Sequence, residues 1–114
     1  MTPEQIALIV ERIVGWKTEI VGGLVYVFQS ENPRFDYWMT WNPETNAADC
    51  EEFIVKLNKC GFYLERWDCP EGRDCSATIV DRLGEELICC DAATTREAVA
   101  AAALWLCENG KVGK

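Results

Sequence analysis

The stretch WMTWNPETNAADCEEF, residues 38–53, changes from an aromatic segment with an extended pattern to a segment with apolar residues at helical spacing. Proline biases the residue before it away from helix, so the Asn42-Pro43 pair ends the extended part. Thr45 or Asn46 is then placed to cap a helix. The apolar stripe of that helix, at helical spacing, is Cys50, Phe53, Ile54 and Leu57. The stretch therefore predicts a short strand or extended segment followed by a helix.

A first helix is predicted at the N-terminal end of the sequence. Thr2 is a capping residue, Pro3 suits the first helical position, and Gln5 completes a capping box. An apolar stripe follows, and Gly15 ends the helix; the stripe is Ile6, Ile9, Val10 and Ile13. Gly22-Gly23 then breaks the chain before a β-rich run. The strand-like segments before the second helix are 24–28 and 37–41, separated by a polar loop over 29–36.

Three short β-rich runs follow Gly61, which is expected to end the second helix. Their ranges are 62–68, 75–81 and 86–91, with turns at 69–75 and 82–85. Apolar residues alternate onto both faces of these runs, whereas a sheet with one wet face alternates more cleanly. We therefore expect a meander of antiparallel hairpins that is covered on both faces.

The last helix is predicted to follow a second capping box, at 94–97, and to end at Gly110. Its sequence AVAAAALWLC, residues 98–107, is apolar all round. A helix without a polar face is buried on more than one side. Either another helix or another subunit is expected to pack on it.

Together these elements predict a single α+β domain over residues 1–114. The expected architecture is an antiparallel β-sheet of four to five strands layered between α-helices. The expected order is helix, one or two strands, helix, three strands, helix. The length fits one domain, and 49% apolar residues are enough to bury a core.

The net charge of −8 argues against DNA binding through a basic patch, which depends on Lys and Arg neutralising phosphates. The sequence has no apolar run of the roughly 20 residues that a membrane span needs, and its N-terminus lacks the basic region of a signal peptide. Cytoplasmic residence is expected. The seven cysteines are then expected to be thiols, and their odd number argues against a closed disulfide framework.

Catalytic patterns are scarce in this sequence. It has no histidine, which excludes Ser-His-Asp and Cys-His sets, and no phosphate-binding glycine loop. The cysteines form no CxxC pair, so we expect no metal and no cofactor. Carboxylates crowd the hairpin ends and leave a hydrolase as an alternative, although a solvated rim is the simpler interpretation. They are Asp68, Glu71, Asp74, Asp81, Glu85, Glu86 and Asp91.

The tryptophans at element ends are the remaining signal. Trp16, Trp38 and Trp41, together with Arg34 or Arg66, are the candidate binding residues, because aromatic rings and guanidinium groups stack nucleobases and anchor protein partners. Closure of the core is the competing interpretation and the favoured one.

Three motifs resemble the phage ABA sandwich domain family of small phage and prophage proteins. They are Ile13-Val14-Gly15-Trp16-Lys17 after the first helix, the run from Trp41 to Asp49, and the alanine-rich segment from Thr95 to Leu104. The resemblance covers nearly the whole chain. It implies an antiparallel sheet between helical layers and a phage origin, but no established activity and no catalytic residue.

We therefore expect a non-catalytic phage or prophage binding protein that acts in the host cytoplasm and forms a homo-oligomer. A counter-defence role fits its acidity, by inhibiting a host nuclease or by sequestering a nucleotide signal. The alternatives are a small carboxylate- or metal-dependent hydrolase and a virion assembly protein.

Overall fold

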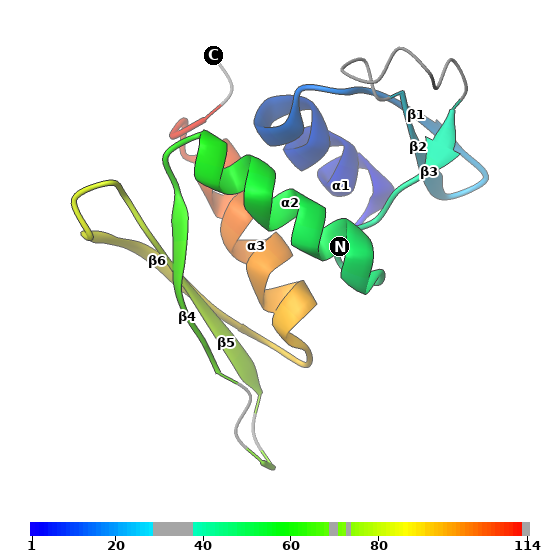
Figure 1. Cartoon of the computed structure of the whole chain (residues 1–114). Helices are drawn as coiled ribbons and strands as arrows, with labels where there is room; N and C mark the ends of the chain where they lie inside the picture. The colour runs from blue at the N-terminus through cyan, green and yellow to red at the C-terminus, as the bar shows by residue number, and fades with distance from the viewer. Residues whose placement is uncertain (29–37, 69–70, 73, 113–114) are drawn as a thin grey trace.

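The elements form in the predicted order, with one more strand than expected. The computed structural model describes residues 1–28, 38–68, 71, 72 and 74–112 (Figure 1). Its helices are α1 (Pro3–Ile9), continued by the π-helical segment η1 (Val10–Val14), α2 (Ala47–Lys59) and α3 (Thr95–Glu108). Its strands are β1 (Lys17–Val21), β2 (Leu24–Phe28), β3 (Met39–Thr40), β4 (Tyr63–Asp68), β5 (Cys75–Val80) and β6 (Glu86–Ala92). The predicted loop 29–36 lies outside the described residues.

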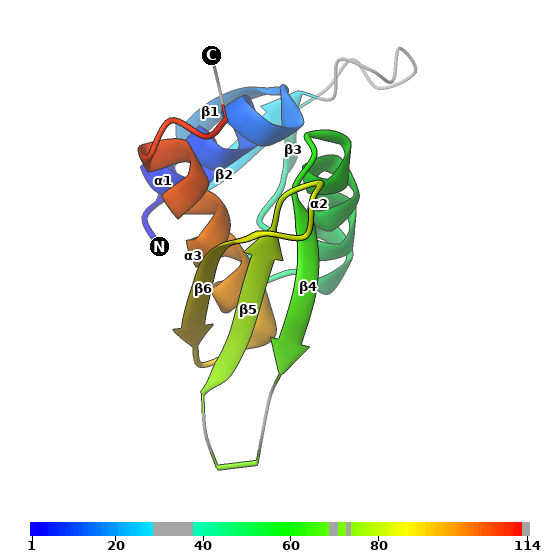
Figure 2. The ribbon, with the colours of Figure 1, turned by 90° about the vertical axis from the view of Figure 1, so that its left-hand side faces the viewer.

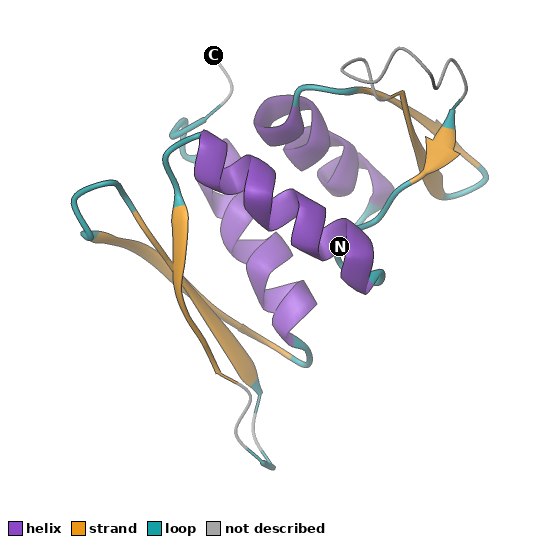
Figure 3. Ribbon diagram, viewed as in Figure 1, coloured by secondary structure: helices purple, strands orange, loops and turns teal. Residues whose placement is uncertain are grey.

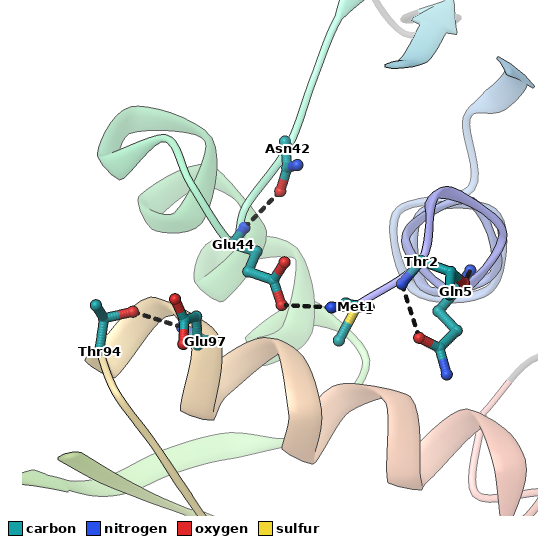
Figure 4. Close-up of polar contacts among 7 residues, drawn as sticks. All are labelled: Met1, Thr2, Gln5, Asn42, Glu44, Thr94 and Glu97. Atoms are coloured by element: carbon teal, nitrogen blue, oxygen red, sulfur yellow. Dashed lines mark hydrogen bonds and ion pairs between the residues drawn. The ribbon is translucent and has the colours of Figure 1, made fainter. Parts of the chain in front are cut away.

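Side-chain caps fix the starts of the helices. Thr2 and Gln5 form the predicted capping box, each side chain accepting from the other's backbone N–H (Figure 4). Asn46, rather than Thr45, caps α2 by accepting from the N–H of Asp49. Thr94 caps α3 by accepting from the N–H of Glu97, which is one half of the predicted capping box (Figure 4). These contacts satisfy backbone donors that the first helical turn leaves unpaired.

Strand β1 is the element that the sequence pattern misses. It pairs with β2 from Lys17↔Phe28 to Val21↔Leu24, so Gly22 and Gly23 form a two-residue hairpin turn. Both glycines have positive φ, 61° and 79°, which that kind of turn requires and which glycine adopts without strain. Four of the five β1 side chains are exposed, so the strand carries no buried apolar alternation by which to recognise it.

The strands form two sheets, each antiparallel and three-stranded. Sheet A has the order β1-β2-β3 and sheet B the order β4-β5-β6. The α+β class is confirmed, but the layers are reversed relative to the expectation. The helices lie between two sheets, instead of one sheet lying between helices (Figures 1 and 3).

Helix α3 lies at the centre of this arrangement. It packs against β5 and β6 on one side and against α1 on another. Half of its fourteen residues are fully buried: Ala98, Val99, Ala100, Ala102, Ala103, Leu106 and Cys107. The small alanine side chains let neighbouring backbones come close. The predicted burial on more than one side is confirmed, and it is provided by this chain's own elements.

Sheet B differs from the expectation of two covered faces. The helices pack on one of its faces, and no described helix lies over the other face, which Figure 2 turns toward the viewer. Tyr63, beside Val80 on the open face, is 40% exposed. Thr78 and Val80 are nevertheless buried, since the two flanking strands cover the central strand β5. An apolar residue on this face, such as Val80, is therefore buried by the neighbouring strands and not by a second layer of helices.

The cysteines are mostly thiols, as expected. Among the described cysteines, Cys75 is the exception, because it is disulfide-bonded. Cys69 lies outside the described residues. The free thiols are Cys50, Cys60, Cys89, Cys90 and Cys107. Within the described part of the chain, no helix combines the length and apolar character needed to cross a membrane.

Candidate functional site

Two of the three candidate tryptophans are core residues. Trp16 and Trp41 are each 2% exposed, and their rings meet edge to face with centroids 5.4 Å apart. Trp41 also contacts Phe53 of α2, at 6.2 Å between centroids. Its indole N–H donates to Glu52 Oε1 at 3.1 Å, which satisfies the one polar atom of the ring. These two rings therefore close the junction of η1, β3 and α2 and have almost no surface to offer a ligand.

Trp38 behaves differently from the other two. It is 41% exposed and lies against Phe28 of β2, with ring centroids 5.8 Å apart and planes tilted by 53°. Of the two candidate arginines, Arg34 lies outside the described residues. Arg66 lies in β4 of sheet B, where its backbone pairs with Thr78, and its side chain is not described. Trp38 and Arg66 therefore belong to different sheets, on opposite sides of the helices (Figure 1).

Trp38 belongs to an apolar surface on sheet A that we call the outer face. Val25 and Val27 of β2 are buried toward the helices, so the alternating residues of β2 point away from them. The register places β1 residues on the same side, as in the pair Val21↔Leu24. The apolar residues of the outer face are Val21, Leu24, Tyr26, Phe28 and Trp38. The same register places Lys17 opposite Phe28 and Glu19 opposite Tyr26 on this face.

Exposure of large apolar side chains is concentrated on this sheet. Among the described residues eight such side chains are exposed, and four of them lie on or directly beside sheet A: Ile20, Val21, Leu24 and Trp38. Val21 is 55% exposed and Leu24 53%. Ile20 pairs with the buried Val25 and faces the helix side, so three of the four belong to the outer face. Val21 and Leu24 lie at the β1–β2 turn, and Trp38 lies against Phe28 at the other end of β2, with Tyr26 between them. Single exposed apolar residues are ordinary, whereas several on one face mark an interaction surface.

A hollow of about 460 Å³ adjoins the outer face and separates sheet A from the start of α2. Its walls combine apolar and polar side chains: Leu24, Met39, Thr40, Trp41, Asn42, Thr45, Asn46 and Asp49. Leu24 belongs both to the hollow and to the outer face, so the two surfaces are continuous. The stretch that decides the fold, residues 38–53, thus provides most of the hollow.

Hydrogen bonds hold the polar side of the hollow in place. Asp49 Oδ2 accepts from the N–H of Asn42 at 3.0 Å, and Asn42 Oδ1 accepts from the N–H of Glu44 at 2.8 Å (Figure 4 shows the second). Glu44 Oε2 in turn lies 3.5 Å from the amino group of Met1. Burial raises the pKa of the Asp49 carboxyl, and the hydrogen bond from Asn42 partly opposes that rise. Asp49 is therefore a positioned carboxylate at the edge of a half-polar hollow.

Acidic side chains line a second hollow, on the helix side of β1. It measures about 310 Å³ and is lined by Glu4, Glu11, Leu8 and Ile20, together with Glu19, whose register places it on the outer-face side of β1. Thr18 Oγ donates to Glu11 Oε1 at 2.5 Å. Sheet A therefore combines an apolar outer face with a negatively charged margin.

The carboxylates at the hairpin ends are not one cluster. The pairs Ser76↔Asp91 and Ser76↔Asp68 are at one end of sheet B, and Val80↔Glu86 is at the other. Asp81 Oδ1 accepts from the N–H groups of Leu83 and Glu85, so its carboxylate shapes the β5–β6 turn. In the described ranges, no three side chains of the metal-binding types come together.

The sequence marks Trp38 as a candidate but does not reveal the outer face around it. That face depends on β1, and the sequence alone shows Val21 and Leu24 only as residues that flank a turn. The signal was present in the glycine pair, because two glycines between strand-like runs are typical of a tight hairpin. The arrangement offers an apolar anchor surface, a half-polar hollow and an acidic margin. This chain matches no known protein family, no curated protein and no solved structure.

Proposed function

We propose that this protein is a non-catalytic binding protein that holds a protein partner on the outer face of sheet A. The observation that carries the proposal is the group of exposed Val21, Leu24 and Trp38 on one sheet. Binding energy at protein interfaces is concentrated in a few aromatic and other large side chains that become fully desolvated in the complex. Trp38, which is held against Phe28, is suited to be such an anchor.

The charge of the molecule favours a basic partner. The net charge is −8, and Glu4, Glu11 and Glu19 lie together at the margin of sheet A. Complementary charge around an apolar contact accelerates association and excludes partners of like charge. The same acidity argues against phosphate-rich partners at this surface.

The specific form of the proposal is phage counter-defence. In this form the protein acts in the cytoplasm of an infected bacterium and occupies the basic nucleic-acid groove of a host nuclease. Its support is the combination of an acidic margin with apolar anchors, which together suit a basic groove with an apolar wall. The resemblance of the sequence motifs to phage proteins motivates the choice of a bacterial nuclease as the partner.

The test is a panel of purified bacterial defence nucleases, assayed with and without micromolar amounts of this protein. We expect inhibition of at least one nuclease, accompanied by a binding isotherm in calorimetry. Trp38→Ala should weaken that binding by about thirtyfold, the effect of losing an interface hot spot of about 2 kcal/mol. Leu24→Ser should weaken it as well.

Val55→Ser is the matched control for Leu24→Ser. Val55 lies on α2 and is 53% exposed, as Leu24 is, but it lies outside sheet A. Equal weakening by both variants would show that general surface apolarity, and not the outer face, drives binding. Absence of binding to every nuclease in the panel would remove the counter-defence form of the proposal.

A further inference from the structure

A third hollow lies between the first turns of α2 and α3, away from sheet A. It measures about 360 Å³. One wall is a stripe of α2 at helical spacing, and the other is the start of α3. The lining residues are Ala47, Cys50, Glu51, Ile54, Thr95 and Arg96. No residue of this hollow belongs to the outer face or to the hollow beside it.

Arg96 brings a positive charge and hydrogen-bond donors to this hollow. Its Nε atom is buried and has no hydrogen-bond partner among the residues that the structure describes. No described carboxylate lies within ion-pair distance of its guanidinium, although Glu51 lines the same hollow. A partly buried guanidinium without a counter-charge costs free energy. Because Nε itself has no accessible surface, a ligand in the hollow would contact the other guanidinium nitrogens.

The surroundings of Arg96 favour an anion as the missing counter-charge. Residues 47 and 95 are the first residues of α2 and α3, so the hollow lies at the positive ends of two helix dipoles. Burial raises the pKa of the Cys50 thiol, and the charge of Arg96 partly opposes that rise. Arg96 lines the same hollow as the α2 residues, so a group bound there would contact both helices.

We propose that the hollow between the first turns of α2 and α3 is an oxyanion-binding site, in which the guanidinium of Arg96 donates to a phosphoryl or carboxylate group. Planar guanidinium groups bind both kinds of oxyanion through paired, charge-assisted hydrogen bonds. The proposal adds a second ligand site to the protein and does not depend on the partner surface of sheet A.

The direct test is a two-dimensional NMR titration that observes the Nε–H signals of the six arginines. Sodium phosphate, sodium acetate and adenosine monophosphate are titrated separately at constant ionic strength, with sodium chloride as the reference. We expect the Arg96 signal to shift saturably, and the signal of Arg82, which lies exposed in the β5–β6 turn, to remain in place. Shifts with phosphate and the nucleotide but not with acetate assign a phosphoryl ligand, and equal shifts with acetate assign a carboxylate. A shift that is no larger than with chloride, or that never saturates, overturns the proposal.

Two variants give effects of opposite sign. Arg96→Gln should weaken phosphate binding by about tenfold or more, as expected for loss of hydrogen bonds from a charged donor. Glu51→Gln should strengthen it by roughly threefold, because a negative charge beside the anion is removed. The second variant keeps the test decisive if Arg96→Gln fails to fold, and unchanged binding in Glu51→Gln would contradict the site. Leu24→Ser should leave the titration unaltered, so failure here and failure of the sheet A proposal are separable.

Discussion

At the residue scale, Trp38 and Trp41 have opposite environments although only two residues separate them. Trp41 is 2% exposed and contacts Trp16 and Phe53, whereas Trp38 is 41% exposed. Removing a buried indole leaves a cavity that the surroundings fill only in part. Trp41→Ala should therefore lower the free energy of unfolding by about 3–5 kcal/mol.

Trp38→Ala is the paired variant, and it should cost about 1 kcal/mol or less because much of its ring is already in water. Urea unfolding followed by circular dichroism measures both free energies. Similar losses in the two variants would mean that Trp38 is a core residue, and its role as an anchor for a partner would have to be abandoned.

The raised pKa of the Cys107 thiol predicts the direction in which the stability of the protein changes with pH. Burial raises its pKa from 9.0 to about 11, with the charge of Arg12 lowering it and those of Glu108 and Cys60 adding to the rise. Between these two pH values the unfolded chain releases the proton while the folded chain retains it. Stability should therefore fall as pH rises from 9 through 11, and this thiol should have no effect on its slope below pH 9.

Thermal unfolding of the wild type and of Cys107→Ala across pH 7–11 measures this contribution. The comparison between the two proteins isolates Cys107 from Cys50, Cys60 and Cys90, whose pKa values are also raised. Parallel curves for the two proteins would show that Cys107 does not titrate differently in the folded state.

At the scale of elements, α3 carries the layered architecture because its residues meet sheet B on one side and α1 on the other. Ala102 is fully buried, whereas the adjacent Ala101 is only partly buried. Extra methylene groups in a well-packed layer force neighbours apart, at about 1–3 kcal/mol. Ala102→Leu should show that loss in chemical denaturation, and Ala101→Leu should cost less than about 1 kcal/mol. The reverse order would mean that α3 has a different rotation about its axis.

The sequence predicts where helices and strands form better than it predicts which of them pair or pack together. The caps at Thr2 and Asn46 and the central position of α3 follow from local patterns that the structure reproduces. The division into two sheets does not follow, since strand runs reveal their own alternation but not which runs share hydrogen bonds. Strand β1 was missed because its side chains are mostly exposed. The apolar pattern of α3 fitted either a second helix or a second subunit, and only the fold identifies α1 as its cover.

The candidate sites were less predictable than the fold for the same reason. Trp38 was recognisable as a large aromatic residue at an element end, but its exposure depends on sheet A, which includes the missed strand. Arg96 gave no signal in the sequence beyond its place in a capping segment. Its character comes from the α2 stripe opposite it, which lies more than forty positions earlier in the chain.

At the scale of the whole molecule, charge and apolar surface act against each other. Every copy has a net charge of −8, and every copy presents Val21, Leu24 and Trp38 on the outer face of sheet A. Repulsion between copies extends about 30 Å at 10 mM salt but only about 3 Å at 1 M. We therefore expect a 12.9 kDa monomer in sedimentation velocity at low salt, and self-association through sheet A as salt is raised.

The variants Leu24→Ser and Val55→Ser locate the surface that associates. Because α3 is covered within the chain, the outer face is the surface expected to associate once repulsion is screened. Leu24→Ser should then keep the protein monomeric at 1 M salt, whereas Val55→Ser should associate as the wild type does. A wild type that stays monomeric at every salt concentration would mean that the outer face is too small to hold a second copy. Binding of a partner to the outer face would then require positive charge on the partner. A second copy of this acidic chain cannot supply that charge, whereas a basic protein can.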